Sequence, residues 1–174
     1  ADGTLQDQLN SRWEKDAEDF RQEVASTLEE YVNNAETYGY PVHNYEAVSR
    51  VQESFLSDRF LSLYIDYYSY TGGAHGFTER RAYNIDLSTG REITLSELFA
   101  PDYDYISIIN EEISKQIQAN NEILFEGEWG FKSIAENQPV YIEKGNLVIY
   151  FGLYEIAPYA SGIQEFRFPL DRFG

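Results

Sequence analysis

Two alternating segments joined by a glycine-rich connection constrain the fold of this chain most strongly. Residues 60–70 (FLSLYIDYYSY) and residues 77–87 (FTERRAYNIDL) each alternate between two sets of side chains at every second position. A period of two is typical of a β-strand with two different faces. The connection Gly72-Gly73-Ala74-His75-Gly76 contains three glycines, which adopt positive φ or let backbones approach closely. The stretch therefore predicts a β-hairpin with His75 in its tip.

The rest of the chain adds two helical patterns and a second strand-rich part. Apolar residues recur every three or four positions over residues 4–37 and again over residues 102–119, which predicts two amphipathic helices. Short alternating segments fill residues 44–99 and 139–171. We expect an α+β fold in which the long N-terminal helix and the second helix pack on one face of an antiparallel sheet, with a C-terminal hairpin and strand added. We expect one domain over residues 1–174.

Charge and composition exclude several classes of function. Thirteen Lys and Arg stand against 30 Asp and Glu, which gives a formal net charge of −17. Such a field repels nucleic acid and anionic membranes and attracts cationic partners, although it also serves solubility alone. The chain has no Cys, so thiolate metal sites, thiol catalysis and disulfides are excluded. No segment approaches the roughly 20 apolar residues of a membrane span, so we expect no membrane insertion by this segment.

His75 in the hairpin tip has two interpretations. Histidine serves as a metal ligand or as a general base, and an exposed tip gives access to both roles. Against this, His43 is the only other histidine, and no His pair has the spacing of a known metal motif. The alternative is a histidine that hydrogen-bonds the backbone of a tight turn. We predict no metal site and no cofactor, and we keep His75 as a candidate ligand-binding residue.

The segment 154–162 (YEIAPYASG) is the stronger candidate for a binding loop. It combines tyrosines, which offer contact area with little side-chain entropy to lose, with a carboxylate, a proline and small residues. The alternative is an ordinary connection whose tyrosines cover the core. Trp129, between Gly127 and Gly130, stacks on a ligand if exposed and closes the core if buried. The predicted ligand-binding residues are Tyr154, Glu155, Pro158, Tyr159, Ser161, His75 and Trp129.

Several passages together resemble the extracytoplasmic sensor domain of RsiV-type anti-sigma factors. The matching passages are Leu61–Phe99 and Val140–Leu170, and the helix around residues 5–24 agrees in position and character. The same domain family occurs in lipoproteins and beside peptidoglycan deacetylase modules. Members usually have a strand before the first long helix, and this chain has no Met and begins almost on that helix. We therefore expect a trimmed N-terminus that lacks this strand.

The resemblance implies a noncatalytic ligand-sensing domain of the bacterial cell envelope. In RsiV-type members this domain binds C-type lysozyme, after which the membrane-anchored anti-sigma factor becomes susceptible to proteolysis and releases its sigma factor. The loop corresponding to residues 154–162 is expected to face that ligand. The resemblance thus implies an extracytoplasmic location and a cationic protein partner such as lysozyme.

Two other functions stay open at this point. One is an enzyme acting on cell-wall glycan through Asp66, His75 or Glu79, although a glycosidase needs two carboxyl groups about 5–10 Å apart, which a sequence does not show. The other is an adaptor whose exposed sheet edge pairs with another chain. We predict that the chain is not an enzyme and has no catalytic residues.

Overall fold

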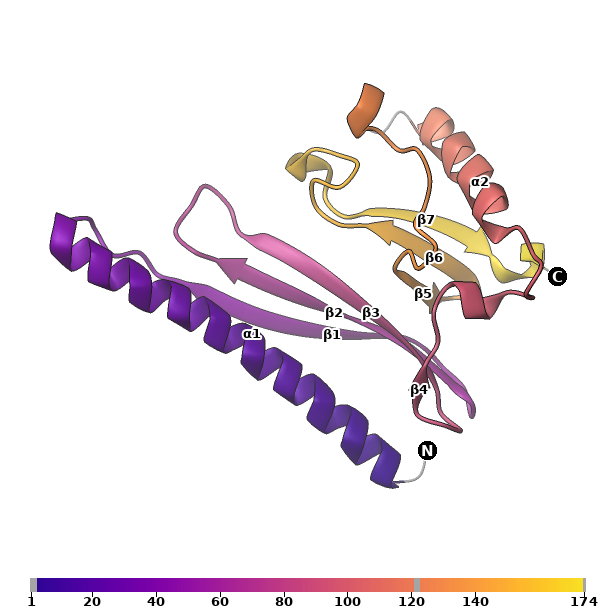
Figure 1. Cartoon of the computed structure of the whole chain (residues 1–174), viewed down its shortest axis with the longest axis horizontal. Helices are drawn as coiled ribbons and strands as arrows, with labels where there is room; N and C mark the ends of the chain where they lie inside the picture. The colour runs from indigo at the N-terminus through magenta and orange to yellow at the C-terminus, as the bar shows by residue number, and fades with distance from the viewer. Residues whose placement is uncertain (1–2, 121–122, 174) are drawn as a thin grey trace. The chain divides into compact units, whose positions relative to one another are not determined.

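The computed structural model describes residues 3–120 and 123–173, which form two compact units (Figure 1). Unit 1 comprises residues 1–51 and 65–81, and unit 2 comprises residues 52–64 and 82–174. The expected α+β class with antiparallel sheets is confirmed. A four-stranded sheet has the order β1 (Glu46–Leu56), β2 (Phe60–Tyr70), β3 (Phe77–Asp86) and β4 (Arg91–Glu92). A three-stranded sheet has the order β5 (Val140–Glu143), β6 (Asn146–Phe151) and β7 (Gln164–Pro169). That the whole chain behaves as one domain stays a prediction, which a single cooperative unfolding transition would support.

Unit 1 is built on the helix α1 (Gly3–Tyr38). Every position of its predicted apolar face is buried or half-buried: Leu5, Leu9, Trp13, Ala17, Phe20, Val24, Leu28, Tyr31 and Ala35. The Phe20 ring meets the Tyr67 ring of β2 edge-on, with 5.3 Å between centroids. The helix ends before Gly39, which takes a φ of 74° and donates its N–H to the carbonyl of Ala35.

The solvent face of α1 carries ion pairs that make its stability depend on pH. Glu18 accepts hydrogen bonds from Arg21 and Gln22, which lower the pKa of its carboxyl from 4.5 to about 2. A carboxyl with a lowered pKa in the folded state stabilises that state above its unfolded pKa. This contribution should therefore be lost as the pH falls from 4.5 towards 2.

An NMR titration of the Glu18 carboxyl checks this prediction directly. We expect Arg21→Gln to raise the Glu18 pKa back towards 4.5, because the hydrogen bonds from the Arg21 guanidinium to the Glu18 carboxylate are then missing. Arg12→Gln, nearly two turns away on the same helix, is the control and should leave the titration midpoint unchanged. An Arg21→Gln midpoint that stays at about 2 would contradict the assignment.

The four-stranded sheet contains the predicted hairpin. Its strands are β1 (Glu46–Leu56), β2 (Phe60–Tyr70), β3 (Phe77–Asp86) and the short β4 (Arg91–Glu92). In the hairpin tip, Gly72 has a φ of 83°, and a Cβ added there would lie 3.0 Å from the Cβ of His43. A Cβ added at Gly76 would lie 2.3 Å from the Tyr68 ring. These two glycines are needed because side chains of unit 1 pack directly on the backbone of the tip.

Unit 2 encloses the larger core. Helix α2 (Tyr105–Asn120) packs on the sheet of β5 (Val140–Glu143), β6 (Asn146–Phe151) and β7 (Gln164–Pro169). The fully buried core side chains include Ile109, Ile113, Leu147, Ile149 and Phe168. Helix α2 begins at Tyr105 rather than near Asp102, because Asp104 is its N-cap and accepts the backbone N–H of Ser107 at 3.2 Å.

Buried polar side chains join β2 and β3 to strand β5 within unit 2. Ser62 Oγ donates to Asn84 Oδ1 at 2.8 Å, and Asn84 Nδ2 donates to the carbonyl of Val140 at 2.8 Å. The backbone N–H of Ile142 donates to Ser62 Oγ at 2.9 Å. Among the residues that the structure describes, no further strand pairs with β5, and these side chains satisfy backbone groups at that edge of the three-stranded sheet. Within unit 2, Ser62 and Asn84 are therefore joined to β5 by specific hydrogen bonds.

Candidate functional site

Two segments of unit 2 form a surface that exposes large side chains. We call it the aromatic loop surface and define it by Ile123, Trp129, Tyr154 and Tyr159. The segments run over residues 123–131 and 152–162, and Figure 1 shows them, orange and gold, at the same end of the three-stranded sheet. The Phe125 N–H donates to the Ile156 carbonyl at 2.9 Å, so the segments lie side by side. Ile123 is 73% exposed, Trp129 72% and Tyr154 50%.

Tyr154 is held in an unusual backbone conformation. Its φ is 66°, a left-handed value that costs a residue with a Cβ about 1–2 kcal/mol. A tight turn maintains it: the Glu155 N–H donates to the Gly152 carbonyl at 3.2 Å, and Glu155 Oε2 accepts the Gly152 N–H at 2.7 Å. The carboxylate of Glu155 thus closes the turn, and the turn presents the Tyr154 ring. The Tyr159 ring lies 5.7 Å from the Tyr154 ring.

Pro158 and Ser161 order the second half of this loop. Pro158 precedes the single helical turn η3 (Tyr159–Ser161), and the N–H of Ser161 donates to the Pro158 carbonyl at 2.9 Å. The Ser161 hydroxyl donates to the carbonyl of Ile123 at 2.9 Å, which fixes the loop to the neighbouring segment. Of the predicted loop residues, Glu155 and Ser161 hold the loop, whereas the Tyr154 ring is exposed and the Tyr159 ring is half-buried.

Trp129 lies in the turn η2 (Gly127–Trp129) on the neighbouring segment. Its exposure excludes the interpretation that it closes the core. The turn is narrow, because a Cβ added at Gly130 would lie 2.5 Å from the carbonyl oxygen of Phe125. Glu126 and Glu128 in the same turn are exposed. The turn therefore presents an indole beside two carboxylates, a combination that suits a cationic partner.

His75 lies in unit 1 and is not part of this surface. Its Nδ1 is 3.0 Å from the Gly76 carbonyl oxygen, which fits the interpretation of a histidine bonded to the backbone of a tight turn. Asp66 is engaged by Arg80 through two hydrogen bonds of 2.6 and 2.8 Å, and Glu79 by Arg81 at 2.7 Å. The carboxyl groups considered for catalysis are thus each paired with an arginine on β3.

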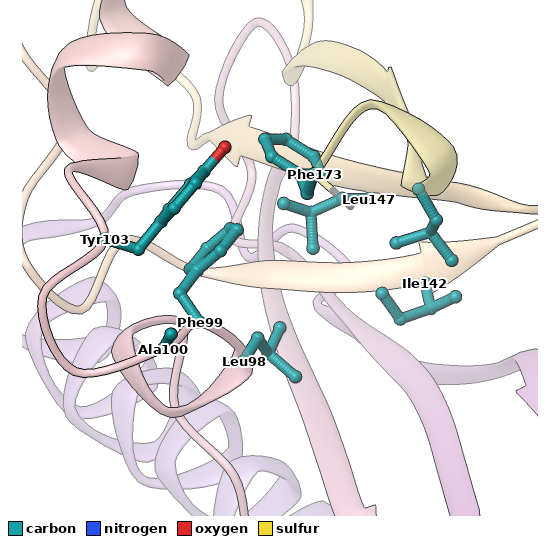
Figure 2. A pocket seen from close by; sticks show the side chains of 8 residues that line it. Leu98, Phe99, Ala100, Tyr103, Ile142, Leu147 and Phe173 are labelled. Atoms are coloured by element: carbon teal, nitrogen blue, oxygen red, sulfur yellow. The ribbon is translucent and has the colours of Figure 1, made fainter.

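Unit 2 also contains an apolar pocket of about 350 Å³ (Figure 2). Its lining consists of Leu98, Phe99, Ala100, Tyr103, Ile142, Leu147, Leu170 and Phe173. The Phe99 ring stacks on that of Tyr103 at 5.5 Å and meets that of Phe173 edge-on at 5.2 Å. Its side chains are all uncharged and, apart from the Tyr103 hydroxyl, apolar, so the pocket suits a largely apolar group.

Sequence reasoning missed Ile123 and the role of Gly130. Ile123 has no periodic pattern around it, so only its exposure marks it as a surface residue. Within residues 3–120 and 123–173, no group of three or more His, Asp or Glu side chains is placed to hold a metal ion. No helix in the described part of the chain is long and apolar enough to cross a membrane.

Two family models match different parts of the chain. Residues 96–171 match the model of the DUF3298 family, described as a protein of unknown function, and residues 1–78 match the family model described as deacetylase PdaC. The first match lies within unit 2, and the second begins in unit 1. Residues 96–171 of the chain are therefore similar to the DUF3298 family.

Two curated proteins of Bacillus subtilis are similar to this chain. The anti-sigma-V factor RsiV is 28% identical over 175 residues, which cover 95% of this chain and 57% of RsiV. The peptidoglycan-N-acetylmuramic acid deacetylase PdaC is 31% identical over 105 residues, which cover 56% of this chain and 22% of PdaC. The chain therefore spans little more than half of RsiV and about a fifth of PdaC. The resemblance to RsiV-type factors is confirmed.

Two crystal structures of DUF3298-family proteins share the fold. The protein from Bacteroides fragilis has a TM-score of 0.64 and 22% identity, and the match covers 94% of this chain and 66% of the other. The protein from Pseudomonas aeruginosa has a TM-score of 0.58 and 20% identity, with 82% of this chain and 65% of the other covered. At these identities the comparison supports the fold alone.

Proposed function

We propose that this chain is a noncatalytic ligand-binding domain on the outer side of a bacterial cytoplasmic membrane, and that its ligand is a cationic protein such as C-type lysozyme. Similarity to the anti-sigma factor RsiV over 95% of the chain supports the sensing role and the location. The observation that carries the binding proposal is the aromatic loop surface, where exposed rings stand beside carboxylates. The chain spans 57% of the length of RsiV, so the proposal concerns this segment alone.

Charge favours this class of partner over others. The chain has a net charge of −17, and the exposed carboxylates of Glu126 and Glu128 lie close to Trp129 in the sequence. A cationic protein is attracted to such a surface and loses this attraction as salt screens it. Trp and Tyr are the side chains that most often dominate binding energy at the centre of an interface. The proposed interface therefore combines a central Trp129 with the negatively charged Glu126 and Glu128 beside it.

Titration calorimetry with C-type lysozyme at two salt concentrations tests the proposal. We expect a complex whose dissociation constant rises at least about tenfold between roughly 50 and 300 mM salt, since the Debye length shortens over that range. The protein should also inhibit muramidase activity in proportion to the complex formed. Lysozyme with acetylated lysines is the matched control, because acetylation removes the charge and keeps the fold; it should bind more weakly. Absence of both complex and inhibition at low salt would refute lysozyme as the ligand.

A glycan-directed enzyme is the second candidate, and the match of residues 1–78 to the PdaC model is what favours it. The residues that it would use are Asp66, His75 and Glu79. Incubation with peptidoglycan, followed by assays for acetate and for reducing ends, separates the two functions. We expect neither product. Acetate release that Asp66→Asn abolishes would replace the binding proposal with an enzymatic one.

A further inference from the structure

The apolar pocket of unit 2 (Figure 2) lies at the end of the three-stranded sheet that is opposite to the aromatic loop surface. Its lining residues Ile142 and Leu147 lie on either side of the turn that joins β5 to β6, whereas the loop of residues 152–162 follows the other end of β6. The helical turn η4 (Leu170–Phe173) follows β7, and its first N–H donates to the Gly145 carbonyl at 2.9 Å. The pocket is therefore separate from the surface proposed to bind a cationic protein.

The lining of this pocket runs from the buried core to the solvent. Ile142 and Leu147 are 5% and 1% exposed and form its inner end. Ala100 and Leu170, by contrast, are exposed and form its mouth. A volume of about 350 Å³ that is open to solvent lies within the roughly 300–1,000 Å³ range of ligand pockets. A molecule in solution can therefore enter it.

Contacts with α2 hold the aromatic walls of the pocket in place. The Phe99 ring stacks on the Tyr105 ring of α2 with 4.9 Å between centroids, and the Phe173 ring packs edge-on against Phe99. In η4, Arg172 pairs with Glu112 of α2 at 2.7 Å. The walls are thus ordered before any ligand arrives, which reduces the entropy lost on binding.

The charges around the pocket disfavour a ligand with an anionic head. Residues 96–104 and 170–173, which supply most of the lining, contain four Asp and Glu against one arginine, and the turn between β5 and β6 adds one Glu and one Lys. With a net charge of −17 on the whole chain, a carboxylate or phosphate head is repelled. The Tyr103 hydroxyl in the lining is a hydrogen-bond donor for an uncharged head, such as the carbonyl of an ester.

The volume of the pocket favours a hydrocarbon chain over a single side chain of a partner protein. An apolar cavity of about 150 Å³ holds one benzene molecule, which has six carbons. At that density, the pocket of about 350 Å³ holds on the order of 12 carbons. A leucine or phenylalanine side chain would fill about half of it or less.

We propose that this pocket binds the hydrocarbon chain of a lipid with one chain and an uncharged polar head, of which a monoacylglycerol is the simplest example. The chain lies against Leu147 and Ile142 at the inner end, between the rings of Phe99 and Phe173. The ester carbonyl stays at the mouth and accepts the Tyr103 hydroxyl. Burial of the chain supplies the affinity, since each methylene removed from water adds to binding. The site shares no residue with the aromatic loop surface and is independent of the lysozyme proposal.

An NMR titration of the whole chain, labelled at the isoleucine and leucine methyl groups, tests this inference. The probes are monoacylglycerols with acyl chains of eight, ten and twelve carbons, each kept below the concentration at which it forms micelles. We expect the methyl signals of Ile142 and Leu147 to shift. The dissociation constant should fall roughly tenfold for every two carbons added, because two further methylenes are buried.

Two variants test the placement of the chain and of the head. Ala100→Trp puts an indole at the mouth of the pocket and should weaken binding at least about tenfold. Ala119→Trp, which adds the same ring at an exposed position near the end of α2, is the matched control and should bind normally. Tyr103→Phe keeps the ring and removes the hydroxyl. It should weaken binding about threefold or more and leave the dependence on chain length unchanged.

Several results would overturn this assignment. One is that no methyl signal of Ile142 or Leu147 shifts with the twelve-carbon probe. Another is equal affinity for all three chain lengths, or equal affinity of Ala100→Trp and Ala119→Trp, because the chain would then lie outside the pocket. Tighter binding of laurate than of the twelve-carbon monoacylglycerol at neutral pH would contradict the uncharged head. None of these outcomes affects the binding of lysozyme, which uses other residues.

Discussion

Asn84→Ala should lower the free energy of unfolding by roughly 2–3 kcal/mol, the largest stability effect that we predict for a single polar side chain. Asn84 is buried, accepts the Ser62 hydroxyl and donates to the Val140 carbonyl. In the alanine variant, the Ser62 hydroxyl and the Val140 carbonyl lose their hydrogen bonds to Asn84. Both residues are buried, so water does not replace these bonds. For a chain of this length, the loss corresponds to a fall in the melting temperature of about 5–10 °C.

Chemical denaturation followed by circular dichroism measures this effect. Asn120→Ala is the matched control in the same unit, because Asn120 is exposed at the end of α2 and its removal should change stability by less than about 0.5 kcal/mol. Ser62→Ala should also destabilise, since Ile142 then loses the oxygen that accepts its N–H. If the Asn84→Ala protein is as stable as the Asn120→Ala control, the hydrogen bonds of Asn84 contribute little to the free energy of unfolding.

Periodicity predicts the elements that depend on local sequence. The apolar face of α1 needs no distant partner to be recognised, because the spacing of Leu9, Val24 and Ala35 follows the helical repeat. The Lys144-Gly145 turn is similarly local: both residues have positive φ, at 49° and 78°, and join β5 to β6 as a two-residue hairpin loop. Such features are stabilised by contacts between residues that are close in the sequence, so the local sequence is enough to predict them.

Alternation misleads where a second sheet covers the polar face. Ser62 alternates with Leu61 and Leu63 and would be assigned to solvent, yet it is fully buried. Its partners include Ile142, which is distant in the sequence, so no local pattern announces the contact. Tyr38 and Tyr40 illustrate the same limit in reverse. They flank Gly39 at the end of α1, and only the folded chain shows that their rings stack on the surface.

The candidate binding loop could be located from composition, whereas its geometry could not. Tyrosines, proline and small residues single out residues 154–162. Nothing in the sequence shows that the Glu155 carboxylate bonds Gly152, or that the Ser161 hydroxyl reaches Ile123. These contacts use the polar side chains within the protein and leave the Tyr154 ring half exposed.

Trp129→Ala should weaken lysozyme binding about 30-fold or more while leaving the fold intact. A central tryptophan of an interface commonly contributes 2 kcal/mol or more of binding energy, which is about 30-fold in the dissociation constant. Because the indole is mostly exposed, its removal should change the free energy of unfolding by less than about 0.5 kcal/mol. Calorimetry with the variant, beside a thermal melt, separates the two effects. Tyr38→Ala removes a similarly exposed ring in unit 1 and should bind lysozyme normally.

Gly130→Ala tests whether the position of the indole matters as well as its presence. The added methyl group would lie 2.5 Å from the Phe125 carbonyl oxygen, so the backbone of the turn must shift while Trp129 itself remains. If the turn presents the indole to the ligand, Gly130→Ala weakens binding in the same direction as Trp129→Ala. Full affinity in both variants would remove this turn from the interface. Weak binding of Trp129→Ala with normal binding of Gly130→Ala would show that the ring adapts to the ligand and does not depend on the narrow turn.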